Sequence, residues 1–163
     1  MPPPSLSDLD AYGYFRLGLA TGLVDRSAPI AWADRQILSD RPPTSEILEL
    51  SLSSRLPYSQ LIRLLTICHP SLDYDLPLFM LLARAGLLLE SGERSAAELA
   101  YNLSLLLAEA ILPELVKGTI SELEAALQDE RLGVITPQEL AGRLAQALAP
   151  YDVYREWLGE VEG

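Results

Sequence analysis

The stretch SAAELAYNLSLLLAEAIL, residues 95–112, carries apolar side chains on almost every face of a helix. A helix that is apolar all round is usually enclosed by other helices. Its carboxylates, Glu98 and Glu109, are isolated and form no continuous polar face. We therefore predict that a helix over about 94–112 is the central element of the fold.

The rest of the chain shows the apolar spacing of three and four residues that is typical of amphipathic helices. No segment alternates apolar and polar residues as a strand would. We predict one compact all-α domain over residues 1–163, with about seven or eight helices. Residues 1–6 are expected to be flexible and residues 68–76 to form the longest internal loop. Gly13 and Gly18 fall inside the first helix, which predicts close neighbours there.

Length and composition limit the class of protein. A chain of 163 residues with 49% hydrophobic content fits one domain. Cys68 is the only cysteine, so no disulfide can form within the chain, which fits a reducing compartment. The start, MPPPSLSDLD, lacks the basic and apolar regions of a secretory signal. The apolar runs are shorter than the roughly 20 residues that cross a bilayer. We expect a cytoplasmic protein without membrane contact.

The charge is strongly and unevenly acidic. The net charge is −11 and the pI is near 4.4. Residues 1–89 contain nine acids and seven bases, whereas residues 90–163 contain fourteen acids and five bases. Nucleic-acid binding needs basic patches, so this balance argues against it. It favours a cationic protein partner, and the alternative is a charge that serves solubility alone.

The stretch QDERLGVITPQEL, residues 128–140, resembles a calcium-binding EF-hand loop at its glycine, its isoleucine and its last glutamate. The first and fifth ligand positions are Gln128 and Leu132, and leucine offers calcium no oxygen. We therefore expect no metal at this loop. It is better explained as a turn in which Gly133 ends one helix, Val134 and Ile135 enter the core, and Thr136 caps the next helix in a box with Glu139.

A similar order of residues occurs in GLVDRSAPIAWA, residues 22–33, where Asp25 or Ser27 is the expected cap. Both stretches read glycine, two apolar residues, cap, proline and apolar residue. Two interpretations stay open. The chain contains a duplicated helical hairpin, or the same turn chemistry is used twice.

Catalytic motifs are missing from the sequence. The single histidine, His69, directly follows Cys68, and adjacent side chains rarely orient as nucleophile and base. The chain contains no phosphate-binding glycine loop and no HExxH motif, and one histidine cannot make a two-histidine metal site. We therefore predict a protein that is not an enzyme and that uses no cofactor and no metal.

Candidate partner-binding residues are the acids and the tyrosine that we expect in loops and at helix ends. Each has an alternative role as a helix cap or a solvated charge. In chain order they are Asp73, Tyr74, Asp75, Glu90, Glu93, Glu109 and Glu114.

The run YFRLGLATGLVDRSAPIAWADRQI, residues 14–37, is followed by EILELSL, residues 46–52. Together they resemble a pattern in small stand-alone bacterial helical proteins, some of which are similar to immunity proteins encoded beside polymorphic or secreted toxins. The resemblance implies a cytoplasmic antidote that binds a cognate basic toxin and has no chemistry of its own. Immunity families share no functional motif, so it assigns no residue.

Protein binding is thus the predicted function, with neutralisation of a toxin as its most specific form. The alternatives are a regulatory or adaptor subunit of a larger bacterial assembly and a small-ligand-binding helical protein. The sequence leaves the oligomeric state open.

Overall fold

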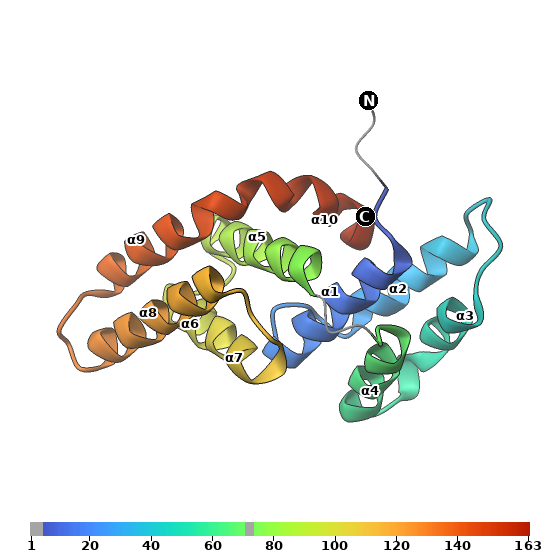
Figure 1. Ribbon diagram of the computed structural model, residues 1–163, viewed down its shortest axis with the longest axis horizontal. Coiled ribbons are helices and arrows are strands. Elements are labelled where there is room, and N and C mark those ends of the chain that lie inside the picture. The colour runs from blue at the N-terminus through green and yellow to red at the C-terminus, as the bar shows by residue number, and fades with distance from the viewer. Residues whose placement is uncertain (1–4, 71–73) are drawn as a thin grey trace.

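The computed structural model describes residues 5–70 and 74–163 and is built from helices (Figure 1). Eight of them have eight or more residues, and the described part of the chain contains no strand, so the all-α prediction is confirmed. In chain order the α-helices and the two short 3-10 helices η1 and η2 are α1 (Asp8–Thr21), α2 (Ser27–Ile37), α3 (Ser45–Ser51), η1 (Ser53–Arg55), α4 (Tyr58–Cys68), α5 (Asp75–Ser91), α6 (Ala96–Ser104), α7 (Leu106–Glu109), α8 (Glu114–Arg131), α9 (Pro137–Leu148), η2 (Ala149–Tyr154) and α10 (Arg155–Glu162).

The central helix is α5. It packs against α1 on one side, against α9, η2 and α10 on another, and against α6 near its end. Its buried side chains therefore occur on nearly every face, and they are Pro77, Leu78, Met80, Leu81, Leu82, Ala83, Ala85 and Leu88. The chain before α5 and the chain after it build the two ends of the molecule around this helix.

The predicted central helix over about 94–112 is wrong in its extent and its position. The segment forms two helices, α6 and α7, with a turn at Leu105 between them. It is also not enclosed, because Tyr101 is 50% and Ile111 75% exposed. The apolar residues surround the whole helix in projection because the two halves bury different faces: α6 packs on α8 and α9, whereas α7 packs on α1.

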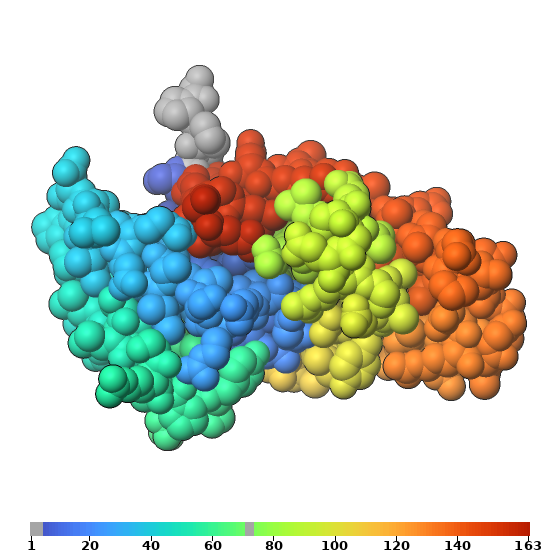
Figure 2. All heavy atoms as spheres, turned by 180° about the vertical axis from the view of Figure 1, so that it is seen from behind, coloured from blue at the N-terminus to red at the C-terminus, as the bar shows by residue number. Residues whose placement is uncertain are grey.

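The molecule has two ends of different construction. Helices α2, α3 and α4 form one end, and the hairpin of α8 and α9 forms the other (Figure 1). The view from behind shows the same division, with the orange hairpin opposite the cyan and green helices (Figure 2). The last helix, α10, returns to pack on α2 and α5. The hairpin is thus the part of the chain that projects from the body.

The close neighbours predicted for the glycines of α1 are confirmed. A Cβ atom on Gly18 would lie 2.3 Å from Cγ2 of Val24, and one on Gly13 would lie 2.9 Å from Cγ of Pro77. The missing side chain of Gly18 lets the chain fold back after α1. Val24 N then donates a hydrogen bond to Gly18 O at 3.1 Å.

Several arginines donate hydrogen bonds to carbonyl groups at helix ends. The last carbonyls of a helix have no partner within it, and a guanidinium satisfies them while opposing the negative end of the helix dipole. The pairs are Arg16 Nη1 with Glu109 O (2.8 Å), Arg26 Nη2 with Leu56 O (2.6 Å), Arg35 Nη2 with Val161 O (2.8 Å) and Arg84 Nε with Leu23 O (2.7 Å). Much of the scarce positive charge therefore serves internal structure.

The α8–α9 junction has the turn chemistry predicted for it, with one difference. Gly133 adopts a left-handed conformation (φ 75°), and Thr136 and Glu139 form the expected capping box. Ile135 packs against the core, but Val134 is 67% exposed, so the prediction that Val134 enters the core is wrong. The five-residue turn lies at the tip of the hairpin, where too little of the body is near to cover both side chains.

The comparable junction after α1 shares the left-handed glycine, Gly22 (φ 75°), and differs elsewhere. Leu23 and Val24 are both buried there. The N-cap residue of α2 is Arg26, without a side-chain cap bond, so neither Asp25 nor Ser27 caps the helix as predicted. Asp25 instead accepts hydrogen bonds from Arg26 N and Ser27 Oγ. The two junctions therefore share a glycine turn and differ in how the following helix begins.

The loop predictions concern residues that the structure describes only in part. Residues 1–4 of the predicted flexible start and residues 71–73 of the predicted 68–76 loop lie outside the described residues. Helix α4 includes Cys68 and α5 begins at Asp75, so the connection is narrower than predicted, at residues 69–74. The connection between α2 and α3, residues 38–44, is one residue longer than the connection between α4 and α5.

Among the described helices, none combines the length and the apolar content that crossing a membrane requires.

Candidate protein-binding groove

Helix α8 carries two stripes of residues at helical spacing. One stripe is buried against α6 and α9 and consists of Val116, Ile120, Leu123 and Leu127, and Ala126 beside it is also buried. The other has successive spacings of four, three, four and three residues and consists of Leu115, Thr119, Glu122, Ala126 and Asp129. That spacing keeps these side chains, two of them carboxylates, on one face of the helix. The second stripe borders an open groove.

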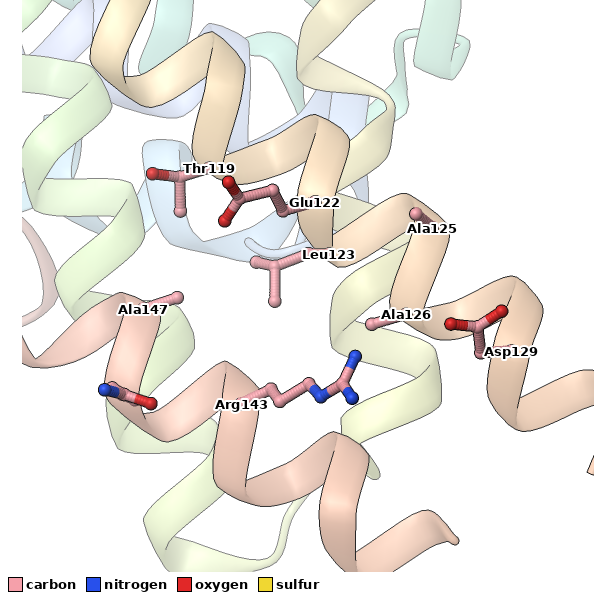
Figure 3. A pocket seen from close by; sticks show the side chains of 9 residues that line it. Thr119, Glu122, Leu123, Ala125, Ala126, Asp129, Arg143 and Ala147 are labelled. Atoms are coloured by element: carbon pink, nitrogen blue, oxygen red, sulfur yellow. The ribbon is translucent and has the colours of Figure 1, made fainter. Parts of the chain in front are cut away.

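The groove lies between α8 and α9 and has a volume of about 510 Å³. Figure 3 shows Leu123, Ala126 and Ala147 pointing into the space between the two helices, with Arg143 reaching toward it from α9. The small alanine side chains leave room that larger residues would fill. The complete lining is Thr119, Glu122, Leu123, Ala125, Ala126 and Asp129 from α8, and Arg143, Gln146 and Ala147 from α9.

The two walls of the groove carry opposite charge. Glu122 and Asp129 lie along α8, and Arg143 stands on α9 (Figure 3). Glu122 and Asp129 are seven residues apart, which is about 10.5 Å along the helix axis. Within the described part of the chain, none of these three side chains makes a hydrogen bond or an ion pair. All three charged groups are therefore available to a partner.

Exposed apolar side chains lie at both ends of the stripe. Leu115 is 79% exposed at the start of α8, and Leu132 and Val134 are 69% and 67% exposed just beyond its end. Single exposed apolar residues are common on protein surfaces. Here three of them lie near the two ends of α8, and clusters of exposed apolar residues are typical of interaction surfaces.

The lining of the groove combines apolar, charged and uncharged polar side chains. Its lining contains neither histidine nor cysteine, the side chains that most often act as base and nucleophile near neutral pH. Among the described residues, no group of three or more histidine, cysteine, aspartate or glutamate side chains is placed to hold a metal ion. An apolar floor between charged walls is the common construction of a protein-binding surface.

Two of the sequence-predicted residues, Tyr74 and Glu109, lie close together around Arg16. The Arg16 guanidinium is 3.3 Å from Glu109 Oε2 and stands over the Tyr74 ring, 5.6 Å from its centroid. Tyr74 is buried and stacks on His69 with ring centroids 4.3 Å apart. A hollow of about 400 Å³ adjoins this cluster. Among the described residues that line this hollow, the one arginine, Arg16, is already paired with a carboxylate.

Glu90 is also held within the molecule. Arg155 donates two hydrogen bonds to its carboxylate, at 3.0 and 2.7 Å. Those bonds hold the pKa of Glu90 below its ordinary value. Glu90 on α5 and Arg155 on α10 thus form an ion pair between the two helices, and the positive charge of Arg155 offsets the negative charge of Glu90.

The remaining predicted residues are spread over the surface. Glu93 is exposed in the α5–α6 connection, and Glu114 is exposed at the first position of α8. Asp75 is the first residue of α5 and not its cap, because the N-cap residue is Tyr74. Asp73 lies outside the described residues. The structure therefore does not gather the six predicted residues that it describes into one site.

Sequence reasoning missed the groove residues Glu122, Asp129 and Arg143. A usable signal was present, because the spacing from Leu115 to Asp129 gives α8 a second stripe in addition to its core stripe. An element that packs against a helix covers one stripe of its side chains. A helix with two such stripes therefore has room for a further packing partner. The sequence alone did not show which stripe lacked one.

The fold and the groove define a small all-α protein with an uncovered, charge-flanked groove on a projecting helical hairpin. Comparison with protein-family models, with curated proteins and with solved structures finds no significant match for this chain.

Proposed function

We propose that this chain is a non-enzymatic protein-binding protein, and that it acts in the cytoplasm as an immunity protein for a cognate toxin with a basic surface. The observation that carries the proposal is the α8–α9 groove, where Glu122 and Asp129 have no partner in the described part of the chain. The apolar residues of the groove and its unpaired carboxylates would together bind a cationic protein that buries apolar side chains at the contact.

The charge of the whole molecule supports a cationic partner. The net charge is −11, and most of the excess belongs to the half of the chain that contains the hairpin. Arginines that could offset it are directed to carbonyl groups inside the fold, as Arg35 and Arg84 are. Such a field raises the rate of encounter with a cationic surface and weakens with added salt.

Affinity capture from the cell that produces the protein tests the proposal, at low and at high salt. The bait is the native chain, the double variant Glu122→Lys/Asp129→Lys, or the control Glu124→Lys/Glu156→Lys. The control makes the same change of charge at exposed sites outside the groove. We expect the native chain and the control to capture one basic protein, with less recovered at high salt, and the groove variant to capture much less.

The captured protein then decides between an antidote and an adaptor. If this chain is an antidote, the captured protein is toxic to cells, and adding the native chain suppresses that toxicity. A captured protein that is harmless to cells would assign the chain to a larger assembly instead. Capture that is the same at both salt concentrations and for all three baits would refute the electrostatic binding proposed here.

A further inference from the structure

We infer that the occupant of the α8–α9 groove is an α-helix of the partner, lying along α8 with two basic residues seven positions apart and small or apolar residues between them. This inference rests on the proposed protein-binding function and specifies its ligand. It follows from the spacing of residues on α8, from the distance between two carboxylates and from the charge of the two walls.

The spacing on α8 favours a helical occupant. Leu115, Thr119, Glu122, Ala126 and Asp129 lie on one face of α8, so a helix that crosses α8 at a shallow angle can contact all of them. The buried Ala126 and the half-buried Ala147 line the groove, and their small side chains leave space above them. A third helix would complete with α8 and α9 the packing that their outer faces lack.

The distance between the carboxylates distinguishes a helix from a strand. Positions seven apart on a helix share one face and are separated by about 10.5 Å along the axis, as Glu122 and Asp129 are. In a strand, residues on one face recur every second position, or about every 6.6 Å, so same-face pairs fall near 6.6 or 13 Å. Two basic side chains on an extended segment therefore match this spacing less closely than two on a helix.

The charges on the two walls of the groove determine which charged residues the bound helix would carry on each side. Two carboxylates on α8 face one guanidinium, Arg143, on α9. A helix with its basic pair toward α8 and an acid toward α9 satisfies all three groups and fixes its own rotation. A second copy of this chain is a poorer occupant, because it would bring another net charge of −11 to the same surface.

Synthetic helical peptides test this inference directly with the full-length protein. One three-heptad peptide carries leucine and alanine along its seam and lysine at two positions seven apart. Its matched control has glutamate at those two positions. Fluorescence anisotropy measures binding of each labelled peptide. We expect the lysine peptide to bind and to weaken with salt, and we expect roughly tenfold or greater loss with the variant Glu122→Lys/Asp129→Lys.

Two matched controls identify the groove as the binding site. Glu124 is exposed and lies on the face of α8 opposite the stripe, so Glu124→Lys is expected to leave binding of the lysine peptide within about twofold. The charge-reversed variant Glu122→Lys/Asp129→Lys is expected to bind the glutamate peptide instead. Circular dichroism establishes that each variant remains folded. A gain of binding with the opposite peptide cannot arise from unfolding.

The possible results separate this inference from the proposed function. Equal binding of both peptides, no binding of either, or an equal loss with Glu124→Lys would overturn the helical occupant. Self-association of the native chain that Glu122→Lys/Asp129→Lys abolishes would overturn it in favour of a second copy. In each case the proposed function stands if affinity capture still recovers one basic protein in a salt-dependent manner, and it falls if capture recovers none.

Discussion

Gly18 is a residue whose role was predictable from its place inside a helix and whose partner was not. A glycine within a helix costs about 1 kcal/mol relative to alanine, so its presence indicated a close neighbour. The identity of that neighbour, Val24, depends on how the chain turns after α1. Sequence patterns report that a side chain must be small, and the fold alone shows what occupies the space.

Substitution of Gly18 by alanine is expected to lower the free energy of unfolding. The new Cβ atom would lie 2.3 Å from Val24 Cγ2, and such overpacking typically costs about 1–3 kcal/mol. Gly142→Ala in α9 is the matched control, because its Cβ atom would meet nothing within 4 Å. It should be neutral or stabilising by up to about 1 kcal/mol. Urea denaturation measures both, and equal effects of the two substitutions would contradict this account.

Tyr14 makes the stability of the protein depend on alkaline pH. Burial, and next the charge of Glu162, raise the pKa of this phenol well above its ordinary value of 10.0. A raised pKa in the folded state gives stability that is complete below about pH 10 and is lost as pH rises further, because the unfolded chain ionises first.

The substitution Tyr14→Phe is therefore expected to have opposite effects in two pH ranges. At neutral pH it removes the hydrogen bond to Glu162 and should cost about 1 kcal/mol. Above pH 10 the variant should lose less stability with each further rise than the native chain does. Urea denaturation across this range provides the measurement. Identical slopes for the two proteins would show that Tyr14 is not the group responsible.

At the scale of elements, helix caps were predicted with mixed success. The N-cap residue of α2 is Arg26 and not Asp25 or Ser27. The Thr136–Glu139 box begins α9 as predicted, because local backbone groups decide such a cap. The helix over 94–112 failed for the opposite reason. Its apolar residues could indicate one enclosing set of neighbours or two sets in succession, and tertiary packing decided in favour of two.

The α8–α9 turn permits a test of its resemblance to a calcium loop. Gly133 has φ 75°, so Gly133→Val forces a β-branched residue into the left-handed region, at a cost of roughly 1–2 kcal/mol or more. We expect thermal unfolding at a lower temperature for this variant. Added calcium should leave the Tm of the native protein unchanged, because Leu132 supplies no ligand oxygen. A rise of Tm with calcium, reversed by a chelator, would restore the metal-site interpretation.

At the scale of the whole molecule, α10 joins segments that are distant in sequence. Its Glu162 accepts a hydrogen bond from Tyr14 of α1 and pairs with Arg84 of α5 at 2.5 Å. Glu160 accepts from Leu6 N at 2.9 Å, and Arg35 of α2 donates to Val161 O. Helix α10 therefore links the segment before α1, α1 itself, α2 and the central helix α5.

Removal of the Glu162 side chain should weaken this closure. Glu162→Ala loses two charge-assisted contacts at a partly buried position, and we expect a loss of about 1–2 kcal/mol. Glu156→Ala, at an exposed position of the same helix, should remain within about 0.5 kcal/mol of the native chain. Denaturant unfolding compares the three proteins. A cost for Glu156→Ala equal to that for Glu162→Ala would assign the effect to helix charge and not to closure.

The groove is the property of the whole molecule that sequence reasoning reached least. Whether Glu122 and Asp129 were solvated or lined a site depended on how far α9 stands from α8. That separation is set by α6 packing on both helices. Acidity in the second half of the chain was visible from the sequence, and the placement of Glu122 and Asp129 beside a groove was not.

The projecting position of α8 has a consequence for local motion. Helix α8 packs on α6 and α9 on one side, while α5 is surrounded by helices on nearly all sides. Segments with fewer buried contacts open locally at lower free energy. Backbone amides of α8 should therefore exchange with deuterated solvent before those of α5, and an occupant of the groove should slow exchange in α8 first.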